Sequence, residues 1–248
     1  MSSIKSSAIV LKSINWRDTS KIVTLFTREE GKISVIAKGA RQLKSKYQGI
    51  LESINLLEVI IYISATRKLQ ILGQASLDNT FKQIRAEYEK TCYTFTLLEL
   101  IDIFFKEGSV DTVFFDFLKT LLIEMEKISD PKYILWYFLL KLSSYLGFRP
   151  EFNECAVCHS HITREDMVFS MKEGAIICRD CRSSSESIWA LSEVARKSLL
   201  ELQNLNHKRI SSAQIIIDEK FMYTEFLLTY LRLHSEEKLD LSSLKIFK

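Results

Sequence analysis

The residues with the clearest chemical pattern are two Cys-x-x-Cys pairs, Cys155 with Cys158 and Cys178 with Cys181, with nineteen residues between them. This spacing lies within the range of four-thiolate zinc ribbons. Two residues between thiolates let each pair form a tight turn that offers two sulfurs to one tetrahedral ion, while backbone N–H groups point back at the sulfurs. Four sulfurs leave no open coordination position. The sequence therefore predicts one structural Zn²⁺ ion and not a catalytic one.

The residues around the cysteines add little to this ligand set. Arg179 and Arg182 flank the second pair, where they either offset part of the formal −2 charge of a zinc tetrathiolate or form only a solvated basic surface. His159 and His161 follow the first pair, and we expect both at the surface because four cysteines already complete the shell. Cys92, the fifth cysteine, is expected to be a small buried hydrophobe. A redox-active pair would ordinarily be single and adjoin a βαβ pattern, so a thiol oxidoreductase is the enzymatic rival.

No other pattern in the chain indicates catalysis. Residues 39–45 superficially resemble a phosphate-binding loop, but Leu43 stands where that motif needs a glycine before Lys44 and Ser45. The sequence contains no G-x-S-x-G elbow, no H-E-x-x-H motif and no cysteine with a convincing histidine partner. The sequence therefore predicts a protein that is not an enzyme.

Basic charge is concentrated in the N-terminal third of the chain. Residues 1–80 contain twelve Lys plus Arg against six Asp plus Glu, whereas the remaining residues contain 22 against 25. Residues 31–51 contain no acidic residue and five basic ones: Lys32, Lys38, Arg41, Lys44 and Lys46. A polyanion is the natural partner of such a segment.

Short apolar and β-branched runs in this third predict five strands, at residues 8–11, 22–27, 33–37, 57–63 and 69–71. A longer connection, residues 39–55, separates the third strand from the fourth. Five strands with this connection suit a small Greek-key barrel of the OB type, although another small barrel, such as an SH3-like one, is the alternative.

An OB-type barrel binds single strands through a cationic groove and exposed rings on which bases stack. We expect lysine and arginine side chains to contact phosphates and two aromatic rings to stack on bases. The candidate nucleic-acid-binding residues are Trp16, Lys32, Lys38, Arg41, Lys44, Lys46 and Tyr47. The alternative is a basic surface that only aids solubility, with Trp16 and Tyr47 buried.

From about residue 81 the apolar residues follow a helical period, and Asp130-Pro131 predicts the start of a very apolar helix that ends near Gly147. Residues 150–185 interrupt the helical pattern, which resumes at residues 189–205 and 220–234. The predicted class is α+β: an OB-type barrel at 1–80, a helical domain at 81–149 and 186–248, and a four-cysteine zinc ribbon inserted at 150–185.

Length and composition fit this division. The chain has 248 residues, 47% of them hydrophobic, which suffices for a sizeable core. The longest unbroken apolar run, residues 133–140, is too short to cross a bilayer, and Lys5, Lys12 and Arg17 interrupt any secretory signal. We therefore expect a cytoplasmic protein whose cysteines are reduced thiols or metal ligands and not disulfides.

Several segments along the chain together form a distinctive pattern. They are Trp16-Arg-Asp-Thr-Ser-Lys-Ile-Val-Thr-Leu-Phe-Thr27 leading to Gly31-Lys32, then residues 37–41 and 44–46, then Leu-Gly-Phe-Arg-Pro at 146–150, and Leu-Lys-Ile-Phe at 244–247. Together these segments resemble the RecO family of bacterial DNA repair and recombination mediators. They occur in the family's order over nearly the whole chain. Asp18 stands where the family usually has Glu, and Leu43 where Pro is common.

The resemblance implies an OB domain, a helical domain and a zinc-binding insertion. Proteins of this family bind single- and double-stranded DNA, promote annealing of complementary strands, and act with RecR to help RecA replace single-strand-binding protein, whose C-terminal tail they contact. The resemblance thus implies a cytoplasmic, nucleoid-associated protein. Its DNA role is carried to Lys38, Arg41, Lys44 and Lys46, and its metal role to the four paired cysteines. A zinc-stabilised protein-interaction module and an RNA-binding OB protein remain as alternatives.

Overall fold

The computed structural model describes residues 2–161, 167–182 and 188–244. The chain divides into two compact units: unit 1 comprises Met1–Lys127 with Leu241–Lys248, and unit 2 comprises Ile128–Asp240. Residues 245–247 of the C-terminal family segment lie outside the described residues. The division at 1–80, 81–149, 150–185 and 186–248 stays a prediction.

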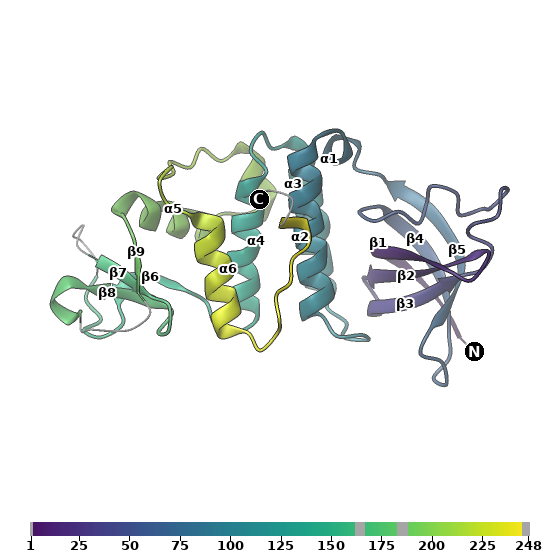
Figure 1. Cartoon of the computed structure of the whole chain (residues 1–248), viewed down its shortest axis with the longest axis horizontal. Helices are drawn as coiled ribbons and strands as arrows, with labels where there is room; N and C mark the ends of the chain where they lie inside the picture. Colours follow the sequence, from purple (N-terminus) through teal and green to yellow (C-terminus); the bar gives the residue numbers. More distant parts are fainter. Residues whose placement is uncertain (1, 162–166, 183–187, 245–248) are drawn as a thin grey trace. The chain divides into compact units, whose positions relative to one another are not determined.

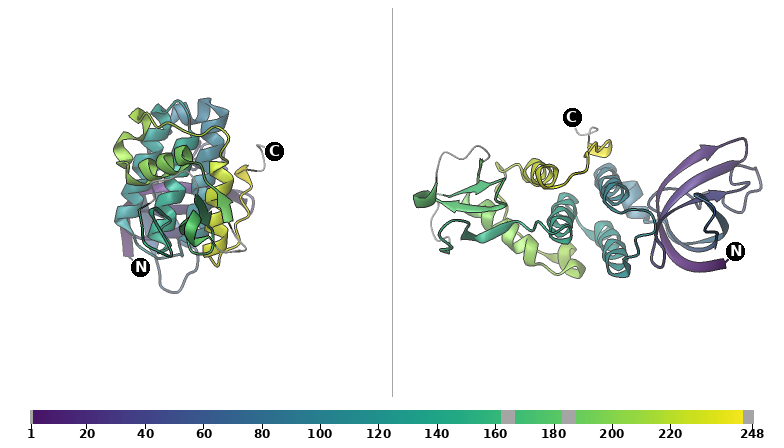
Figure 2. Two further views of the ribbon diagram at one scale, coloured as in Figure 1. Left: turned by 90° about the vertical axis from the view of Figure 1, so that its left-hand side faces the viewer. Right: turned by 90° about the horizontal axis from the view of Figure 1, so that it is seen from below.

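Five strands of unit 1 form a closed barrel: β1 (Ser2–Trp16), β2 (Ser20–Thr27), β3 (Gly31–Ala37), β4 (Leu56–Ile63) and β5 (Gln70–Asn79). Their order around the barrel is β1-β2-β3-β5-β4, and β1 also pairs with β4. Strand β3 pairs with β5 in parallel, whereas the other pairs are antiparallel. The strands curl around one core in Figures 1 and 2. The predicted α+β class with an N-terminal OB-type barrel is thus confirmed.

Strand β1 is much longer than the predicted residues 8–11 because it serves two partners. Its first half, from Ser2, pairs with β4, and its second half, as far as Trp16, pairs with β2. A bulge between Val10 and Lys12 separates the two halves. The ends of the strand carry polar residues with exposed side chains, so the hydrophobic pattern marks only the buried centre.

Unit 1 also contains three helices, α1 (Lys82–Ala86), α2 (Tyr88–Phe104) and α3 (Thr112–Lys127), of which α2 packs against the barrel strand β1. Phe26 of β2 makes the link, since its ring centroid lies 5.1 Å from that of Phe105 and 5.9 Å from that of Phe115. All three rings are buried. Aromatic contacts at these distances stabilise beyond their buried area, so the end of α2 is held firmly on the strands.

Unit 2 combines three helices with a small sheet. The helices are α4 (Lys132–Tyr145), α5 (Glu193–Asn204) and α6 (Tyr223–His234), with a 3₁₀ turn η2 at His207–Ser212. The sheet has the order β6-β8-β7-β9, formed by β6 (Glu151–Cys155), β8 (Ala175–Cys178), β7 (Met167–Ser170) and β9 (Ile188–Ala190). Strand β9 lies beyond residue 185 and pairs with β7, so the sheet extends past the predicted insertion.

Helix α4 begins one residue after Pro131, and the Asp130 side chain accepts a hydrogen bond from the backbone N–H of Lys132 at 3.3 Å. The helix is buried over most of its surface, and its Trp136 ring stacks on Tyr223 with centroids 4.4 Å apart. These aromatic residues therefore form core, as the sequence predicts. None of the helices in the described residues is long and apolar enough to cross a membrane.

Candidate metal centre and nucleic-acid interface

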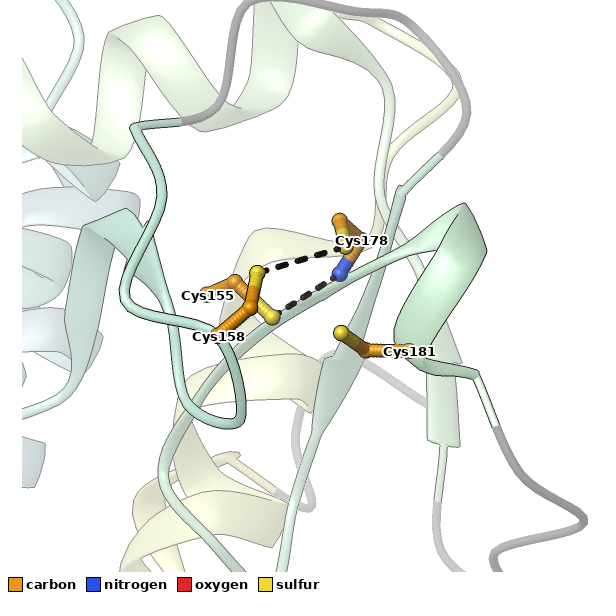
Figure 3. Close-up of side chains that lie close together, drawn as sticks. All are labelled: Cys155, Cys158, Cys178 and Cys181. Carbon is orange, nitrogen blue, oxygen red and sulfur yellow. Dashed lines mark hydrogen bonds between the residues drawn. The ribbon is translucent and has the colours of Figure 1, made fainter.

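The four cysteines come together because β6 and β8 are neighbours in the sheet of unit 2. Cys155 is the last residue of β6 and begins the first turn, and Cys178 is the last residue of β8. The 3₁₀ turn η1 (Arg179–Cys181) then brings Cys181 back toward the same point. Figure 3 shows the four side chains pointing toward one another. Their Sγ atoms all lie within 4.8 Å of one another.

These distances fit a tetrahedral metal ion. Metal–sulfur bonds of about 2.3 Å in a tetrahedron place the sulfurs about 3.8 Å apart. The Sγ atoms of Cys158 and Cys178 are 3.8 Å apart, and the backbone N–H of Cys178 donates to Cys155 Sγ at 3.4 Å (Figure 3). Such N–H···S bonds stabilise ligating thiolates and fix their direction. The cluster can therefore hold a metal ion, and the predicted N–H groups aimed at a sulfur are present.

Without a cation, the four sulfurs cannot all be thiolates at neutral pH. Burial opposes ionisation of Cys155, but backbone N–H groups of Cys158, Cys178 and Val157 outweigh burial and lower the pKa of Cys155 to about 6. The neighbouring Cys158 and Cys178 side chains instead raise the pKa of Cys181 to about 12. A bound dication removes this conflict because it attracts all four negative charges.

The surroundings of the cluster agree with a closed structural site. Cys155 is fully buried and packs with Val168 and Ile177, whereas Cys158 is exposed. His159 and His161 are exposed, as predicted. Arg179 and Arg182 are also exposed, and their role in offsetting the charge of the cluster stays a prediction. Cys92 lies far along the chain on α2 and is buried at 4% exposure, as predicted.

The second candidate site is the connection between β3 and β4, residues 38–55, which we call the basic loop. Four of its predicted phosphate contacts have exposed side chains: Lys38, Arg41, Lys44 and Lys46. Among the described residues, none of the four forms an ion pair with a carboxylate. In the described part of the chain no carboxylate offsets their charge, and the Lys46 ammonium donates to the Gly73 backbone oxygen at 2.6 Å and lies 5.0 Å from the centroid of the Tyr47 ring.

Backbone contacts hold the basic loop against the turn between β1 and β2. The Arg41 guanidinium donates to the carbonyl oxygen of Arg17 at 2.9 Å, and the Arg41 backbone N–H donates to Thr19 O at 2.9 Å. Arg17 is itself an exposed cation, but its neighbour Asp18 is an exposed carboxylate, so the turn adds no net charge to the site. Arg17 lies in a polar turn, and nothing in the local sequence of that turn predicts a contact with a loop 24 residues away.

The structure contradicts the predicted stacking role of Tyr47. The Tyr47 side chain is only 4% exposed and packs in the barrel core. Its hydroxyl donates to the carbonyl oxygens of Leu72 and Gly73 at 2.9 and 3.0 Å. The ring anchors the basic loop to β5 and is not accessible to a base. The prediction failed because a tyrosine in a polar stretch can place its ring inward and still satisfy its hydroxyl.

Trp16 remains available for stacking, since it is 41% exposed, and it is the last residue of β1 and not part of a loop. Lys12, Ile14 and Trp16 alternate along β1, so they share the outer face of the barrel. Opposite them on β2 are Thr24 and Ile22. The residues of this face other than Trp16, together with Lys32 and Ser34 of β3, line a groove of about 430 Å³, which we call the strand-face groove.

Lys32 lies at the edge of this groove and is already paired. Its ammonium group is 3.3 Å from Asp102 Oδ1 and also donates to the Asp102 backbone oxygen. Only 13% of the Lys32 side chain is exposed. In this conformation Lys32 is therefore not free to contact phosphate. The sequence analysis did not find Asp102, because it lies 70 residues away on α2 and no local pattern links the two.

The fold and the site together define an OB-fold protein whose second unit carries four cysteines placed to hold a metal ion. The family model described as "Recombination protein O N terminal" matches residues 1–81, and the model "Recombination protein O C terminal" matches residues 85–242. The chain belongs to the RecO family, as its sequence segments predict.

Relatives named DNA repair protein RecO match nearly the whole chain. The protein of Caldicellulosiruptor saccharolyticus is 27% identical over 100% of this chain and 99% of its own length. The protein of Caldanaerobacter subterraneus is 30% identical over 95% of this chain and 96% of its own. That of Shouchella clausii is 28% identical over 91% and 87%. The similarity thus extends over the barrel, the helices and the cysteine cluster.

Proposed function

We propose that the protein is a non-enzymatic DNA-binding recombination mediator of DNA repair. It binds single- and double-stranded DNA, promotes annealing and, with RecR, supports loading of RecA onto DNA coated by single-strand-binding protein, whose C-terminal tail it contacts. One observation carries the DNA-binding part: the basic loop of an OB-type barrel presents four exposed cations that lack carboxylate partners. Membership of the RecO family supports the roles with RecR, RecA and the tail, to which we assign no residues. This function takes place at the nucleoid, in the cytoplasm.

Annealing of this kind needs no active site. Cations that contact phosphates lower the repulsion between two strands, and base pairing then supplies the driving force. Trp16, exposed at the end of β1 and next to the turn that contacts Arg41, provides a ring for stacking. Stacking of one base on such a ring is worth about 1–3 kcal/mol.

For the metal centre we propose Zn²⁺. Four thiolates in a tetrahedron suit Zn²⁺, and a site with no open position stabilises a fold without taking part in a reaction. Metal analysis of the purified protein tests this, and one zinc ion per chain is the expected result. The ion would hold the two turns together, and no step of DNA binding passes through it.

Fluorescence anisotropy of labelled single-stranded DNA across a salt series tests the DNA-binding function. Four phosphate contacts predict a slope of log K against log salt near −2.8, which is about a 50-fold loss of affinity between 50 and 200 mM. Arg41→Glu with Lys44→Glu removes two contacts, so we expect a slope near −1.4 and about a 7-fold loss over the same range. Lys208→Glu with Arg209→Glu is the matched control, because both are exposed residues of unit 2.

An identical slope in the Arg41/Lys44 variant and in its control would contradict the proposed interface. Weak binding with no salt dependence in the unaltered protein would instead favour a zinc-stabilised protein-interaction module. Competition between RNA and DNA of the same sequence separates the third class, because an RNA-binding protein contacts the 2′-hydroxyl and prefers RNA.

A further inference from the structure

The strand-face groove has the shape of a binding site but not the charge of one. Two apolar side chains line it, Ile14 at 53% exposure and the half-buried Ile22, and Trp16 continues the same face of β1. Lysine side chains stand at its edges. A single strand placed there would have a ring, an apolar surface and cations within reach, which is the combination that OB-type barrels use.

Two carboxylates from the segment after the barrel cancel the groove's positive charge. Lys12 Nζ is 2.7 Å from Asp102 Oδ2, and Lys32 contacts the other oxygen of the same carboxylate. Glu107, the second acidic residue lining the groove, accepts a hydrogen bond from the Ser34 hydroxyl at 2.6 Å. Two lysines and two carboxylates leave a formal charge of zero, so a polyanion gains no Coulomb energy there.

The backbone fixes these carboxylates in place. The N–H of Gly108 donates to the carbonyl oxygen of Lys32 at 2.9 Å, so the segment after α2 pairs with the edge of β3. Phe105 of the same segment is buried against Phe26. Burial works against ionisation of Asp102, but the hydrogen bond and charge of Lys12 and the charge of Lys32 outweigh it and keep its pKa below the ordinary value. Asp102 is therefore a carboxylate at neutral pH.

We propose that Asp102 and Glu107 form a carboxylate gate that withholds the strand-face groove from DNA, Asp102 by pairing with Lys12 and Lys32 and Glu107 by adding a second negative charge. This inference rests on the proposed function and adds its regulation. While the gate is in place, DNA is confined to the basic loop. A strand enters the groove only when its phosphates displace the Asp102 carboxylate from Lys12 and Lys32. Such competition weakens the hold on DNA, which suits a protein that must release the annealed product.

The test replaces Asp102 with Asn, which keeps an oxygen that accepts hydrogen bonds but removes the charge. Anisotropy titrations of single-stranded DNA are carried out across the same salt series. Without the carboxylate, Lys12 loses its ion pair and Lys32 keeps only its bond to the Asp102 backbone oxygen, so the number of phosphate contacts rises from four toward six and the slope steepens from near −2.8 toward −4.2. The loss of affinity between 50 and 200 mM then grows from about 50-fold toward about 340-fold.

Asp116→Asn is the matched control for net charge. Asp116 on α3 pairs with Arg28 through two hydrogen bonds of 2.9 and 3.0 Å, and neither residue lines the strand-face groove. Its neutralisation also frees one cation of unit 1. Lys12→Gln added to Asp102→Asn should return about half of the gained slope, because it removes one of the two released contacts.

The gate is overturned if Asp102→Asn and Asp116→Asn change the slope equally, or if Asp102→Asn changes nothing. This failure is distinct from failure of the proposed function. If the unaltered protein and the Arg41/Lys44 variant bind alike, the basic loop is not the interface, and a gain in Asp102→Asn alone still supports the gate. Thermal unfolding of every variant is measured as a control for retention of the fold.

Discussion

Replacement of Gly31 by Ala tests whether the segment after α2 is held as tightly on β3 as the structure shows. Gly31 has φ +65°, and a Cβ atom there would lie 2.0 Å from the backbone oxygen of Ser109. Ordinary van der Waals contact begins at 3.4 Å, so this backbone must retreat by about 1.4 Å. The left-handed conformation costs about 1–2 kcal/mol for a residue with a Cβ. Loss of the hydrogen bond from Gly108 to Lys32 adds about 1 kcal/mol, giving roughly 2–4 kcal/mol once the contact strain is included.

Gly49→Ala is the matched control for this prediction. Gly49 has φ +71°, close to that of Gly31, but a Cβ there would meet nothing within 4 Å. Its replacement should therefore cost only the conformational part, about 1–2 kcal/mol. The difference between the two variants isolates the contact with Ser109.

Amide hydrogen exchange followed by mass spectrometry is the suitable assay, because the two compact units need not unfold together. Peptides from β2 and β3 report on unit 1 directly. We expect exchange there to accelerate about 30- to 700-fold in Gly31→Ala and about 5- to 30-fold in Gly49→Ala, since each 1.4 kcal/mol is tenfold. Equal acceleration in the two variants would show that the segment yields without cost, and the reasoning about its tight docking would be refuted.

Four further predictions concern the cysteine cluster, the barrel core, base stacking and the response to acid. Cys178→Ser should lower bound metal below one ion per chain, whereas Cys92→Ala should leave metal content unchanged; full occupancy in the first variant would contradict the site. Tyr47→Phe should cost about 1–3 kcal/mol in urea unfolding, because it removes a buried hydroxyl, without weakening DNA binding. Trp16→Ala should weaken DNA binding by about 1–3 kcal/mol in anisotropy titrations, and equal effects at the two positions would be inconsistent with the observed exposures. The two lysines lower the pKa of Asp102, so the stabilising effect of this carboxylate is present above the ordinary aspartate pKa of about 4 and fades as the pH falls below it. The free energies of unfolding of the unaltered protein and of Asp102→Asn, measured in urea, should therefore converge at acid pH. A difference between them that stays constant with pH would count against the pairing.

The metal centre was the most predictable part of the molecule. Its ligands are fixed by local spacing, since each pair forms one turn and the only long-range requirement is that the two turns meet. The sequence also predicts the five strands, because the residues that point into the core alternate, but it does not predict where the strands end. Strand β1 continues to Trp16 through exposed residues, and only its pairing with β2 reveals this.

Interactions between distant segments could not be predicted from the sequence. Lys32 pairs with Asp102 across 70 residues, and neither residue has a local signal for the other. The inward position of Tyr47 depends on two carbonyl groups of β5, which become available only when the barrel closes. The charge pattern of the sequence thus predicts the basic segment, and the structure shows which of its basic side chains lack a carboxylate partner among the described residues.

Because the C-terminal segment belongs to unit 1, this unit is completed only late in the synthesis of the chain. The Ser243 hydroxyl lies 2.8 Å from Thr96 Oγ1 and donates to Glu99 at 2.7 Å, although the chain leaves unit 1 after Lys127 and returns only at Leu241. At about 5–20 residues per second, a ribosome needs roughly 6–23 s to make the intervening residues. During those seconds the nascent barrel and α1–α3 exist with this part of α2 uncovered. The polar groups of Thr96 and Glu99 are then left to water until Ser243 has been made.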